Sequence, residues 1–361
     1  MLHAPADRQT PDRIRSCTNR SADTRSPYSF NNHESRTVRP HHRRTASVVA
    51  LAISAGVILS GCASPTSASP STPTASGYPV SVDSCGVKGE YAQAPSRVVL
   101  GYPRTLETLA ALGVDDSVYG YTLGGYDALP ADYPTTIVEV SPDYAPAREA
   151  MIAAAPDLYL ANDEGQVLGD GTVSYDDLAQ AGTNVYVLGQ YCADAPAPTS
   201  ITRVYDDVTD LGAIFGVPER ASEVVASLKD RVSAAAARNP GDPLSVAYLQ
   251  VYDGKIYANG GYPAAGILNA LNVTNVFADL PHNFTEITKE QALVLTPDVI
   301  MVNYVGAGNE QAGIDEVRAL LPDSPAVKNG RVYGSDETDY EAGGVSLIAN
   351  LEYVADTLFP R

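Results

Sequence analysis

One fourteen-residue pattern occurs twice in the chain, and no other sequence feature constrains the fold as strongly. Residues 149–162 and residues 290–303 both read Glu, six residues, Pro-Asp, four apolar residues and Asn. Proline ends a helix, and a short apolar run after it is typical of a buried strand. The pattern therefore predicts one helix-to-strand unit in each of two lobes, although this connection is common enough in α/β proteins to occur twice by chance.

The segments around the repeat alternate between apolar runs and helical stretches. Two longer helical segments, 199–215 and 219–238, separate a first group of strands from a second. Alternation of this kind predicts an α/β fold class: two lobes with mainly parallel sheets covered by helices, joined by a single long helix. The expected strands are 97–100, 118–121, 158–161, 184–188, 244–251, 299–303 and 331–333, and the expected shorter helices are 105–112, 146–154, 175–181, 264–271 and 345–358.

Residues 1–61 differ in composition from the rest of the chain. They hold nine arginines, four acidic side chains and four of the five histidines, which leaves 15 basic and 39 acidic side chains, a net charge of −24, in the remainder. Basic residues 41–44 precede an uncharged apolar run, 46–61, that is shorter than the roughly 20 residues of a membrane span. This order predicts a secretory signal, with an N-terminal transmembrane helix as the alternative. Residues 1–40 are long for a signal, so we expect the true translation start to lie downstream.

The apolar run closes with Leu59-Ser60-Gly61-Cys62, which resembles the lipobox of bacterial lipoproteins. The resemblance implies cleavage before Cys62 and a lipid on its sulfur, which would anchor the exported chain to the outer face of the cytoplasmic membrane. A tether rich in Ser, Thr and Pro follows, and such a composition does not form a packed core. The expected boundaries are signal 1–61, lipidated cysteine and tether 62–77, N-terminal lobe 78–217, connecting helix 218–239 and C-terminal lobe 240–361.

Two cysteines remain for the folded part of the chain. Cys17 is removed with the signal and Cys62 carries the lipid, which leaves Cys85 and Cys192. An even pair of cysteines in an oxidising compartment predicts a disulfide, and two free thiols are the alternative. The bond would close a loop of roughly 100 residues, worth up to about 4–5 kcal/mol in the chain-entropy model.

Several motifs extend in a characteristic order over nearly all of residues 78–361. They begin with Tyr78-Pro-Val-Ser-Val-Asp-Ser-Cys-Gly, continue through residues 94–99, 105–114 and the two Pro-Asp units, and end with residues 324–333. Together they resemble the substrate-binding proteins of ABC importers, of the class that binds iron–siderophore complexes, haem or cobalamin. The resemblance implies two α/β lobes bridged by one long helix, with the ligand in the cleft between them. We expect a monomer that delivers a small-molecule chelate to an ABC permease with its cytoplasmic ATPase, and that meets the membrane through its lipid alone.

The two glutamates of the repeat have a role in the class that the chain resembles. There, one glutamate on each lobe docks into an arginine pocket of the permease, and Glu149 and Glu290 fall on those motif positions. Two separated carboxylates would orient the protein on a basic partner surface. The alternative is that both are ordinary solvated carboxylates on helices.

Candidate ligand-binding residues follow the predicted strands. In open α/β sheets ligands bind outside the carboxyl ends of the strands. Tyrosine suits such a site because it combines a flat apolar face with a hydroxyl group, and the chain has 22 tyrosines but no tryptophan. The candidates are Tyr102, Arg104, Tyr121, Asn162, Asp163, Glu164, Asn259, Tyr262, Asn303, Tyr304, Asp336, Glu337 and Tyr340.

The same candidates narrow the ligand. A bare metal ion would draw on imidazole or thiolate, and His282 is the one histidine after residue 61, so we expect no metal site. Arg104 is the single basic candidate, able to pair with a ligand carboxylate, phosphate or iron-bound oxygen, whereas anionic catecholate complexes would favour several basic groups. A ferric siderophore of the hydroxamate type therefore fits best, with cobalamin, haem or another large cofactor-like solute as alternatives. No covalent cofactor is expected apart from the lipid on Cys62.

Other function classes find less support in the sequence. The acidic net charge argues against a nucleic-acid partner. We expect no enzyme, because the chain has no nucleophile-elbow sequence, P-loop or dinucleotide glycine spacing. A lipid-anchored hydrolase that uses His282, and a sensor or adhesion lipoprotein with the same two lobes, remain as alternatives.

Overall fold

The computed structural model describes residues 77–122, 133–169, 171–192, 199–241, 243–280, 284–306 and 308–361. All of these residues belong to one compact unit of the chain. The predicted signal, the lipidated Cys62, His282 and all of the tether except Gly77 lie outside the described residues.

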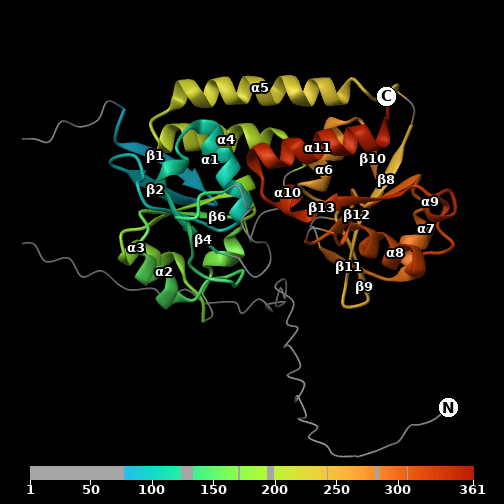
Figure 1. Ribbon diagram of the computed structural model, residues 1–361, viewed down its shortest axis with the longest axis horizontal. Coiled ribbons are helices and arrows are strands. Elements are labelled where there is room, and N and C mark those ends of the chain that lie inside the picture. The colour runs from blue at the N-terminus through green and yellow to red at the C-terminus, as the bar shows by residue number, and fades with distance from the viewer. Residues whose placement is uncertain are drawn as a thin grey trace, which may run out of the picture. The chain divides into compact units, whose positions relative to one another are not determined.

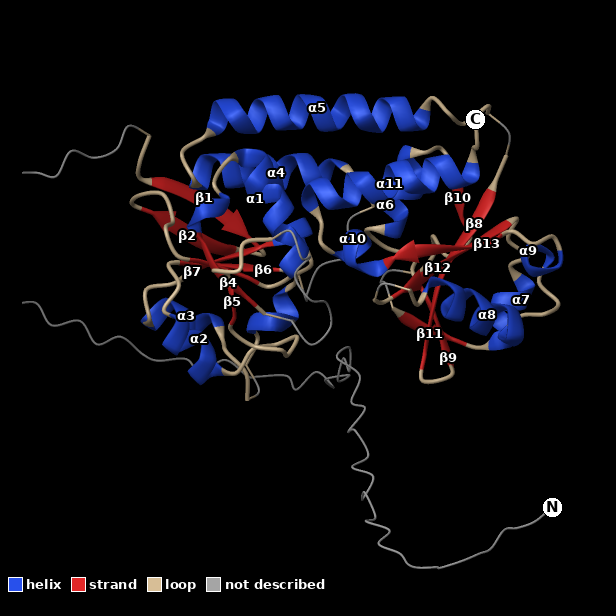
Figure 2. Ribbon diagram, in the orientation of Figure 1, coloured by secondary structure: helices blue, strands red, loops and turns tan. Residues whose placement is uncertain are grey.

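The first sheet has five strands in the order β5-β4-β3-β6-β7, and every neighbouring pair is parallel. All residues of β3 and β6 are buried, because helices cover both faces of a parallel sheet. An antiparallel hairpin of β1 and β2 precedes the sheet (Figure 2). The elements are β1 (Val80–Ser84), β2 (Val87–Tyr91), β3 (Val98–Leu100), α1 (Leu106–Leu112), β4 (Val118–Tyr121), β5 (Val138–Glu139), α2 (Arg148–Ala154), β6 (Leu158–Ala161), α3 (Tyr175–Gln180) and β7 (Asn184–Val187).

The second sheet is mixed. Its strands run in the order β11-β9-β8-β12-β13, with β10 paired beside β8. β10, β8, β12 and β13 are parallel, whereas β9 is antiparallel to both β8 and β11. The elements are β8 (Ser245–Tyr252), β9 (Lys255–Ala258), α6 (Ala264–Ala270), β10 (Thr274–Asn275), β11 (Thr285–Ile287), α7 (Lys289–Val294), β12 (Val299–Tyr304), α8 (Glu310–Leu320), α9 (Pro325–Lys328), β13 (Val332–Asp336), α10 (Glu337–Glu341) and α11 (Gly344–Leu358).

Helices α4 (Thr202–Ile214) and α5 (Pro218–Ala236) connect the two sheets. Pro218 begins α5 at a position where its missing N–H costs nothing. α5 packs against α1, α4 and α11, and Figure 1 shows it running above these helices along both lobes. The predicted fold class, two α/β lobes joined by a single long helix, is therefore confirmed.

One hydrophobic core runs through both lobes. It includes Leu100 of β3, Leu228 of α5, Tyr248 of β8 and Leu351 of α11, all nearly or fully excluded from solvent. Because these side chains pack in a single cluster, the connecting helices are part of the core rather than a separate linker.

The Pro-Asp units have a structural explanation. Asp157 accepts hydrogen bonds from the Ser96 and Arg97 amides at 2.7 and 3.0 Å, just before β3 begins. Asp298 accepts from the Ser245 amide at 2.9 Å and from its hydroxyl at 2.7 Å, at the start of β8. Since β6 pairs with β3 and β12 pairs with β8, each aspartate ties its own strand to the neighbouring one.

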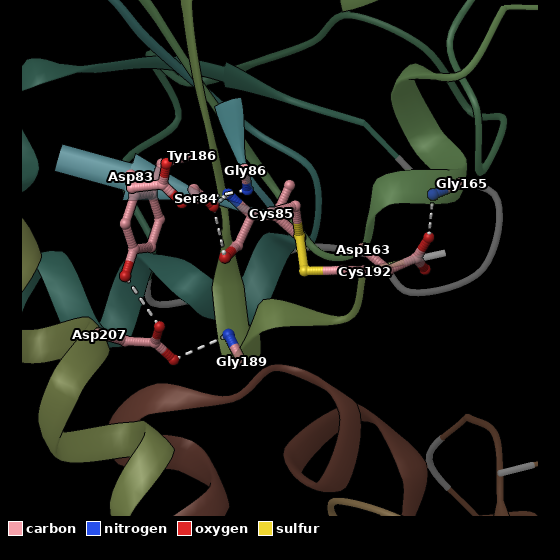
Figure 3. Close-up of a disulfide and its surroundings, with 11 residues drawn as sticks. Asp83, Ser84, Cys85, Gly86, Asp163, Gly165, Tyr186, Gly189, Cys192 and Asp207 are labelled. Atoms are coloured by element: carbon pink, nitrogen blue, oxygen red, sulfur yellow. Dashed lines mark hydrogen bonds between the residues drawn. A yellow bond between two sulfur atoms is a disulfide. The ribbon is translucent and has the colours of Figure 1, made fainter. Parts of the chain in front are cut away.

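The predicted disulfide between Cys85 and Cys192 is present (Figure 3). It joins the β1–β2 hairpin to the segment that follows β7, and the Val187 amide donates to Ser84 Oγ at 2.8 Å beside it. The alternative of two free thiols is therefore wrong.

Candidate functional site

The carboxyl ends of the parallel strands hold most of the predicted site residues. In the first sheet Tyr121 lies at the end of β4, Tyr102 follows β3, and Asn162 follows β6. In the second sheet Asn303 of β12 is paired with Gln250 and Ser335, and Tyr304 is paired with Asp336. Each sheet thus brings its candidates to one edge, as the strand-end rule predicts.

Asn259 is an exception, and the reasoning that selected it is wrong. It follows β9, which is antiparallel, so its amide donates to the Tyr248 carbonyl at 3.0 Å instead of lying at the carboxyl edge. Its Oδ1 accepts from the Phe284 amide at 2.9 Å, and the side chain is 2% exposed. The structure therefore gives Asn259 a place in the packing of the second lobe.

Side chains of the two lobes meet along one surface. The Tyr191 and Tyr262 rings lie 5.5 Å apart, Arg104 forms an ion pair with Asp339 at 3.3 Å, and Tyr102 packs with Ala342 and Tyr144. We call this surface the interlobe face. Its residues are Tyr102, Arg104, Tyr144, Asp163 and Tyr191 from the first lobe, and Tyr262, Asp339, Tyr340, Glu341 and Ala342 from the second.

Arg104 already has anionic partners on this face. Its guanidinium lies 3.2 Å from Glu107 and 3.3 Å from Asp339, which belong to different lobes. Glu107 in turn accepts from the Ser346 hydroxyl at 2.7 Å, and the Val345 amide donates to Thr108 Oγ1 at 3.2 Å. The guanidinium predicted to meet a ligand anion is part of a polar connection between α1, α10 and the start of α11.

The carboxyl groups of Asp163 in the first lobe and Glu341 in the second lobe influence one another electrostatically. Asp163 accepts hydrogen bonds from the Tyr144 hydroxyl and from the Gly165 amide, and burial raises its pKa to about 6. Burial also raises the pKa of Glu341 well above its usual range, with further contributions from Glu337 and Asp163. Each carboxyl is therefore held where an added negative charge is unfavourable.

The predicted tyrosines on this face are packed rather than exposed. Tyr102 is 1% exposed, and Tyr262 and Tyr340 are fully buried. Tyr340 stacks on Tyr248 at 5.4 Å between ring centroids, and its hydroxyl accepts from the Ala264 amide at 3.1 Å. Burial raises the pKa of both Tyr262 and Tyr340 well above the usual value, so these hydroxyls stay protonated.

Several other candidates support the local fold. Asp336 caps α10 by accepting from the Thr338 amide at 2.9 Å, and Glu337 accepts from Gln250 at 2.5 Å. Burial raises the pKa of Tyr304 to about 12, with smaller contributions from neighbours that include Asp336 and Glu310. Glu164 donates its amide to the Tyr191 carbonyl at 3.0 Å, which holds the segment that carries Tyr191.

The sequence reasoning missed Tyr144, Tyr191, Asp339 and Glu341. Tyr191 follows the strand predicted at 184–188, so the strand-end rule already pointed to it. Asp339 and Glu341 flank Tyr340, and helix α10 brings all three to the interlobe face. Tyr144 follows no predicted strand, and its placement depends on the tertiary contact with Asp163.

The segment that carries Tyr191 is anchored by a buried carboxyl group. Asp207 of α4 accepts from the Gly189 amide at 2.8 Å and from the Tyr186 hydroxyl at 2.9 Å (Figure 3). Burial raises the pKa of Asp207 to about 7. Hydrogen bonds to Asp207 of α4 thus hold the turn between β7 and Cys192 in place.

Glu149 and Glu290 occupy the same place in the two repeats. Each is the second residue of its helix, α2 or α7, and each is exposed. Neither forms an ion pair with another side chain in the described ranges. A carboxylate in the first turn also stabilises a helix through its dipole, which is the structural alternative to docking.

The described residues hold no group of three or more His, Cys, Asp or Glu side chains arranged to bind a metal ion. None of the helices in the described ranges is long and apolar enough to cross a membrane.

Comparison with known proteins gives a consistent result. Residues 98–338 match the family model described as periplasmic binding protein. An uncharacterized ABC transporter substrate-binding lipoprotein of Bacillus subtilis, YvrC, is 27% identical over 326 residues, 88% of this chain and 98% of the relative. A cobalamin-binding protein of Halobacterium salinarum is 27% identical over 67% of this chain and 62% of its own length.

A solved structure agrees with these matches. It is an ABC-type Fe³⁺-hydroxamate transport system protein from Saccharomonospora viridis, 28% identical, with a TM-score of 0.67. The similarity covers 78% of this chain and 99% of that one. The match therefore extends over both lobes.

Proposed function

Because the chain belongs to the periplasmic binding protein family, and is thus a solute-binding protein of an ABC importer rather than an enzyme, we propose that it binds a ferric siderophore of the hydroxamate type at the interlobe face and delivers it to a permease. The solutes of this class are siderophore, haem or cobalamin complexes. The observation that carries the choice is the composition of the interlobe face, where Tyr191 and Tyr262 of the two lobes lie 5.5 Å apart and Arg104 is already paired with Glu107 and Asp339.

Two features support a hydroxamate complex over a catecholate. Tyr191 is half-buried against the buried ring of Tyr262, and its flat apolar face suits a large ligand that carries little charge. Arg104 already pairs with Glu107 and Asp339, which leaves its guanidinium less able to balance a highly anionic complex. The solved relative of 28% identity is named for a Fe³⁺-hydroxamate transport system, which is consistent with this choice.

Cobalamin is the second candidate ligand. Two thirds of the chain is similar to a relative named as a cobalamin-binding protein, and cobalamin is also large with little net charge. The same interlobe tyrosines would serve either ligand, so binding measurements must separate the two.

Anchoring and delivery complete the proposal. The relative with 98% of its length matched is named a lipoprotein, which supports a lipid on Cys62 at the outer face of the cytoplasmic membrane. Glu149 and Glu290 lie at equivalent exposed positions of the two lobes, as expected for two contacts with a two-part permease.

Ligand binding is tested by titration of the purified chain. Tyrosine fluorescence should fall on addition of a ferric hydroxamate and stay constant with the metal-free siderophore or free Fe³⁺. Tyr191→Phe should weaken binding, whereas Tyr205→Phe, at the α4–α5 contact, is the matched control. Tighter binding of cobalamin or haem would replace the hydroxamate assignment, and no response to any of these chelates would refute the proposed function.

Docking is tested separately from binding. Glu149→Gln and Glu290→Gln should leave chelate affinity unchanged and reduce uptake in cells that depend on this protein. Glu219→Gln is the matched control, because Glu219 also lies exposed in the first turn of a helix, α5. Normal uptake by the double variant would contradict the docking role.

A further inference from the structure

One tyrosine hydroxyl lies between two carboxyl groups of α4. Tyr186 Oη is 2.9 Å from Asp207 Oδ1 and 3.0 Å from Asp210 Oδ2. A phenol has a single hydrogen, and a hydrogen bond prefers a nearly straight geometry, so this hydrogen can serve only one of the two contacts well. The other contact brings the phenol oxygen against a carboxyl oxygen, and it is favourable only when that carboxyl group carries a proton of its own.

The Gly189 amide restricts where this proton can lie. It donates to Asp207 Oδ2 at 2.8 Å, so that oxygen already serves as an acceptor. The proton therefore lies on Asp207 Oδ1 or on Asp210 Oδ2, the two oxygens that face the hydroxyl. Asp207 is fully buried, and burial raises its pKa to about 7. Burial also raises the pKa of the half-buried Asp210, and it raises that of Tyr186 well above the usual value, so the hydroxyl keeps its hydrogen.

One guanidinium faces the two carboxyl groups without binding either of them directly. Arg203 lies one helical turn before Asp207 on α4, and its ion pair in the described part of the chain is with Asp206 at 3.1 Å. Its Nε and Nη2 are buried and have no hydrogen-bond partner among the described residues. The positive charge of Arg203 lowers the pKa of Asp207 and Asp210, but the effect of burial is larger. Three tyrosines also interact electrostatically with these carboxyl groups, namely Tyr91 of β2, Tyr186 of β7 and Tyr262 of the second lobe.

Asp207 supports residues of the interlobe face through Gly189. The backbone of Gly189 is left-handed, with φ of 61°. A Cβ atom at this position would lie 3.1 Å from the Tyr191 ring and 3.2 Å from the Tyr262 ring, so the turn packs directly against both rings. These two rings belong to different lobes and lie 5.5 Å apart. The hydrogen bond between Asp207 and the Gly189 amide therefore helps to position one aromatic side chain of each lobe.

We propose that Asp207 and Asp210 share one bound proton at neutral pH through the Tyr186 hydroxyl, and that this proton keeps the turn at Gly189 in place. Loss of the proton leaves two carboxylates against one hydroxyl hydrogen in a largely buried site, where like charges repel strongly. The two tyrosine rings packed on the turn then lose part of their support, so chelate affinity should fall together with the stability of the fold. The effect on affinity rests on the proposed solute-binding function, whereas the proton site does not.

The pH dependence of unfolding tests the proton site. An unfolded aspartate has a pKa of about 4, so the folded pair keeps its proton to a higher pH than the unfolded chain does. The stabilisation is fully present below the unfolded pKa and is lost as pH rises through the folded pKa of about 7. Asp207→Asn replaces the protonated carboxyl by an amide that can accept from Gly189 and donate to Tyr186 at every pH. The urea midpoint of the unchanged chain should therefore fall relative to that of Asp207→Asn between pH 5 and pH 8.

Further variants establish that a single proton is shared. Asp210→Asn should change the pH profile of the midpoint as Asp207→Asn does, and the double variant should change it no further. Asp230→Asn, which removes an exposed carboxyl group of α5, is the matched control and should follow the unchanged chain. Parallel profiles for the unchanged chain and Asp207→Asn would overturn the proposal. A double variant whose effect equals the sum of the two single effects would mean that each carboxyl group holds its own proton, and would refute the sharing.

A binding profile connects the proton site to the interlobe face. Affinity for ferrioxamine B should fall severalfold between pH 6 and pH 8.5, and the fall should be smaller in Asp207→Asn. Burial also raises the pKa of Asp163 and Glu341 on this face, but the variant retains both, so the difference between the two profiles belongs to Asp207. Equal falls would overturn the link between the proton and the interlobe face. Absence of binding to any hydroxamate, catecholate, corrinoid or haem would refute the proposed function, while the unfolding profiles would still decide the proton site.

Discussion

In the first lobe, α2 passes through Ala155 and Asp157 into β6, and in the second lobe α7 passes through Thr296 and Asp298 into β12. Ala155 and Thr296 both adopt a left-handed backbone, with φ of 45° and 40°, and both aspartates hold the neighbouring strand. The helix surfaces differ, because Ala153 of α2 is replaced at the equivalent position by Val294 of α7, which is 78% exposed. The fold therefore requires the left-handed residue and the aspartate of each repeat, whereas the exposed position held by Ala153 and Val294 can vary.

The lobes also differ in how their edges are closed. The first lobe has an all-parallel sheet, and a disulfide joins its preceding hairpin to the segment after β7. The second lobe closes its sheet with the antiparallel strands β9 and β11, and the structure describes no disulfide there. The disulfide thus attaches the hairpin at the edge of the first lobe, whereas hydrogen bonds between strands attach the corresponding edge of the second lobe.

Removal of the disulfide should have the largest effect on stability. The bond spans a sequence separation of 107 residues, so the chain-entropy model gives a loss of up to about 4–5 kcal/mol for Cys85→Ser with Cys192→Ser. The measurement is urea unfolding, and because one core runs through both lobes we expect a single transition. An unchanged midpoint would show that the hairpin is held by its side-chain bonds alone, and two separate transitions would contradict the continuous core.

The two aspartates should come next. Asp157→Ala removes an acceptor for three donors at 2.7 to 3.0 Å, so we expect the unfolding free energy to fall by about 2 kcal/mol. Asp298→Ala removes an acceptor for two donors, so its loss of unfolding free energy should be somewhat smaller. Asp157→Asn and Asp298→Asn keep one acceptor oxygen and serve as milder controls. Losses below about 0.5 kcal/mol for both would mean that water replaces these bonds without cost.

The contribution of Asp298 should depend on pH. Hydrogen bonds from Ser245 hold its pKa below the usual value, so the folded state binds a proton less readily than the unfolded state. The stabilisation is therefore present above the unfolded pKa of about 4 and is lost as pH falls through the lowered folded pKa. The difference in unfolding free energy between the chain and Asp298→Ala should shrink between pH 5 and pH 2.5, and a constant difference would contradict the assignment.

The sequence predicted buried strands better than strands with one exposed side. The central strands β3, β6, β8 and β12 were identified because their residues are almost all apolar and buried on both faces. Strands β2 and β11 were missed, because edge strands exposed on one side mix polar and apolar residues as loops do. Periodicity reports burial, so an element with little burial leaves little signal.

The site was predicted less completely, for a different reason. The strand-end rule assumes parallel strands, so it placed Asn162 and Asn303 correctly at carboxyl ends of strands but misplaced Asn259, because β9 is antiparallel. Glu341 interacts electrostatically with Asp163 of the other lobe, and Tyr144 packs beside Ala342 of the other lobe, and both pairings depend on tertiary structure. A rule based on strand ends cannot predict which side chains of one lobe contact those of the other.

The smallest effect is expected where the two copies differ. Val294→Ala gives α7 the residue that α2 has at this position, and because Val294 is 78% exposed its removal should change the unfolding free energy by less than about 0.5 kcal/mol. Ala292→Gly, two residues earlier at a buried position of the same helix, is the comparison and should cost more than about 1 kcal/mol, through lost packing and backbone entropy. Urea unfolding of both variants measures the difference. A large loss of unfolding free energy for Val294→Ala would mean that this side chain packs against the second lobe. The fold would then require this residue, as it requires the Pro-Asp pair of the same repeat.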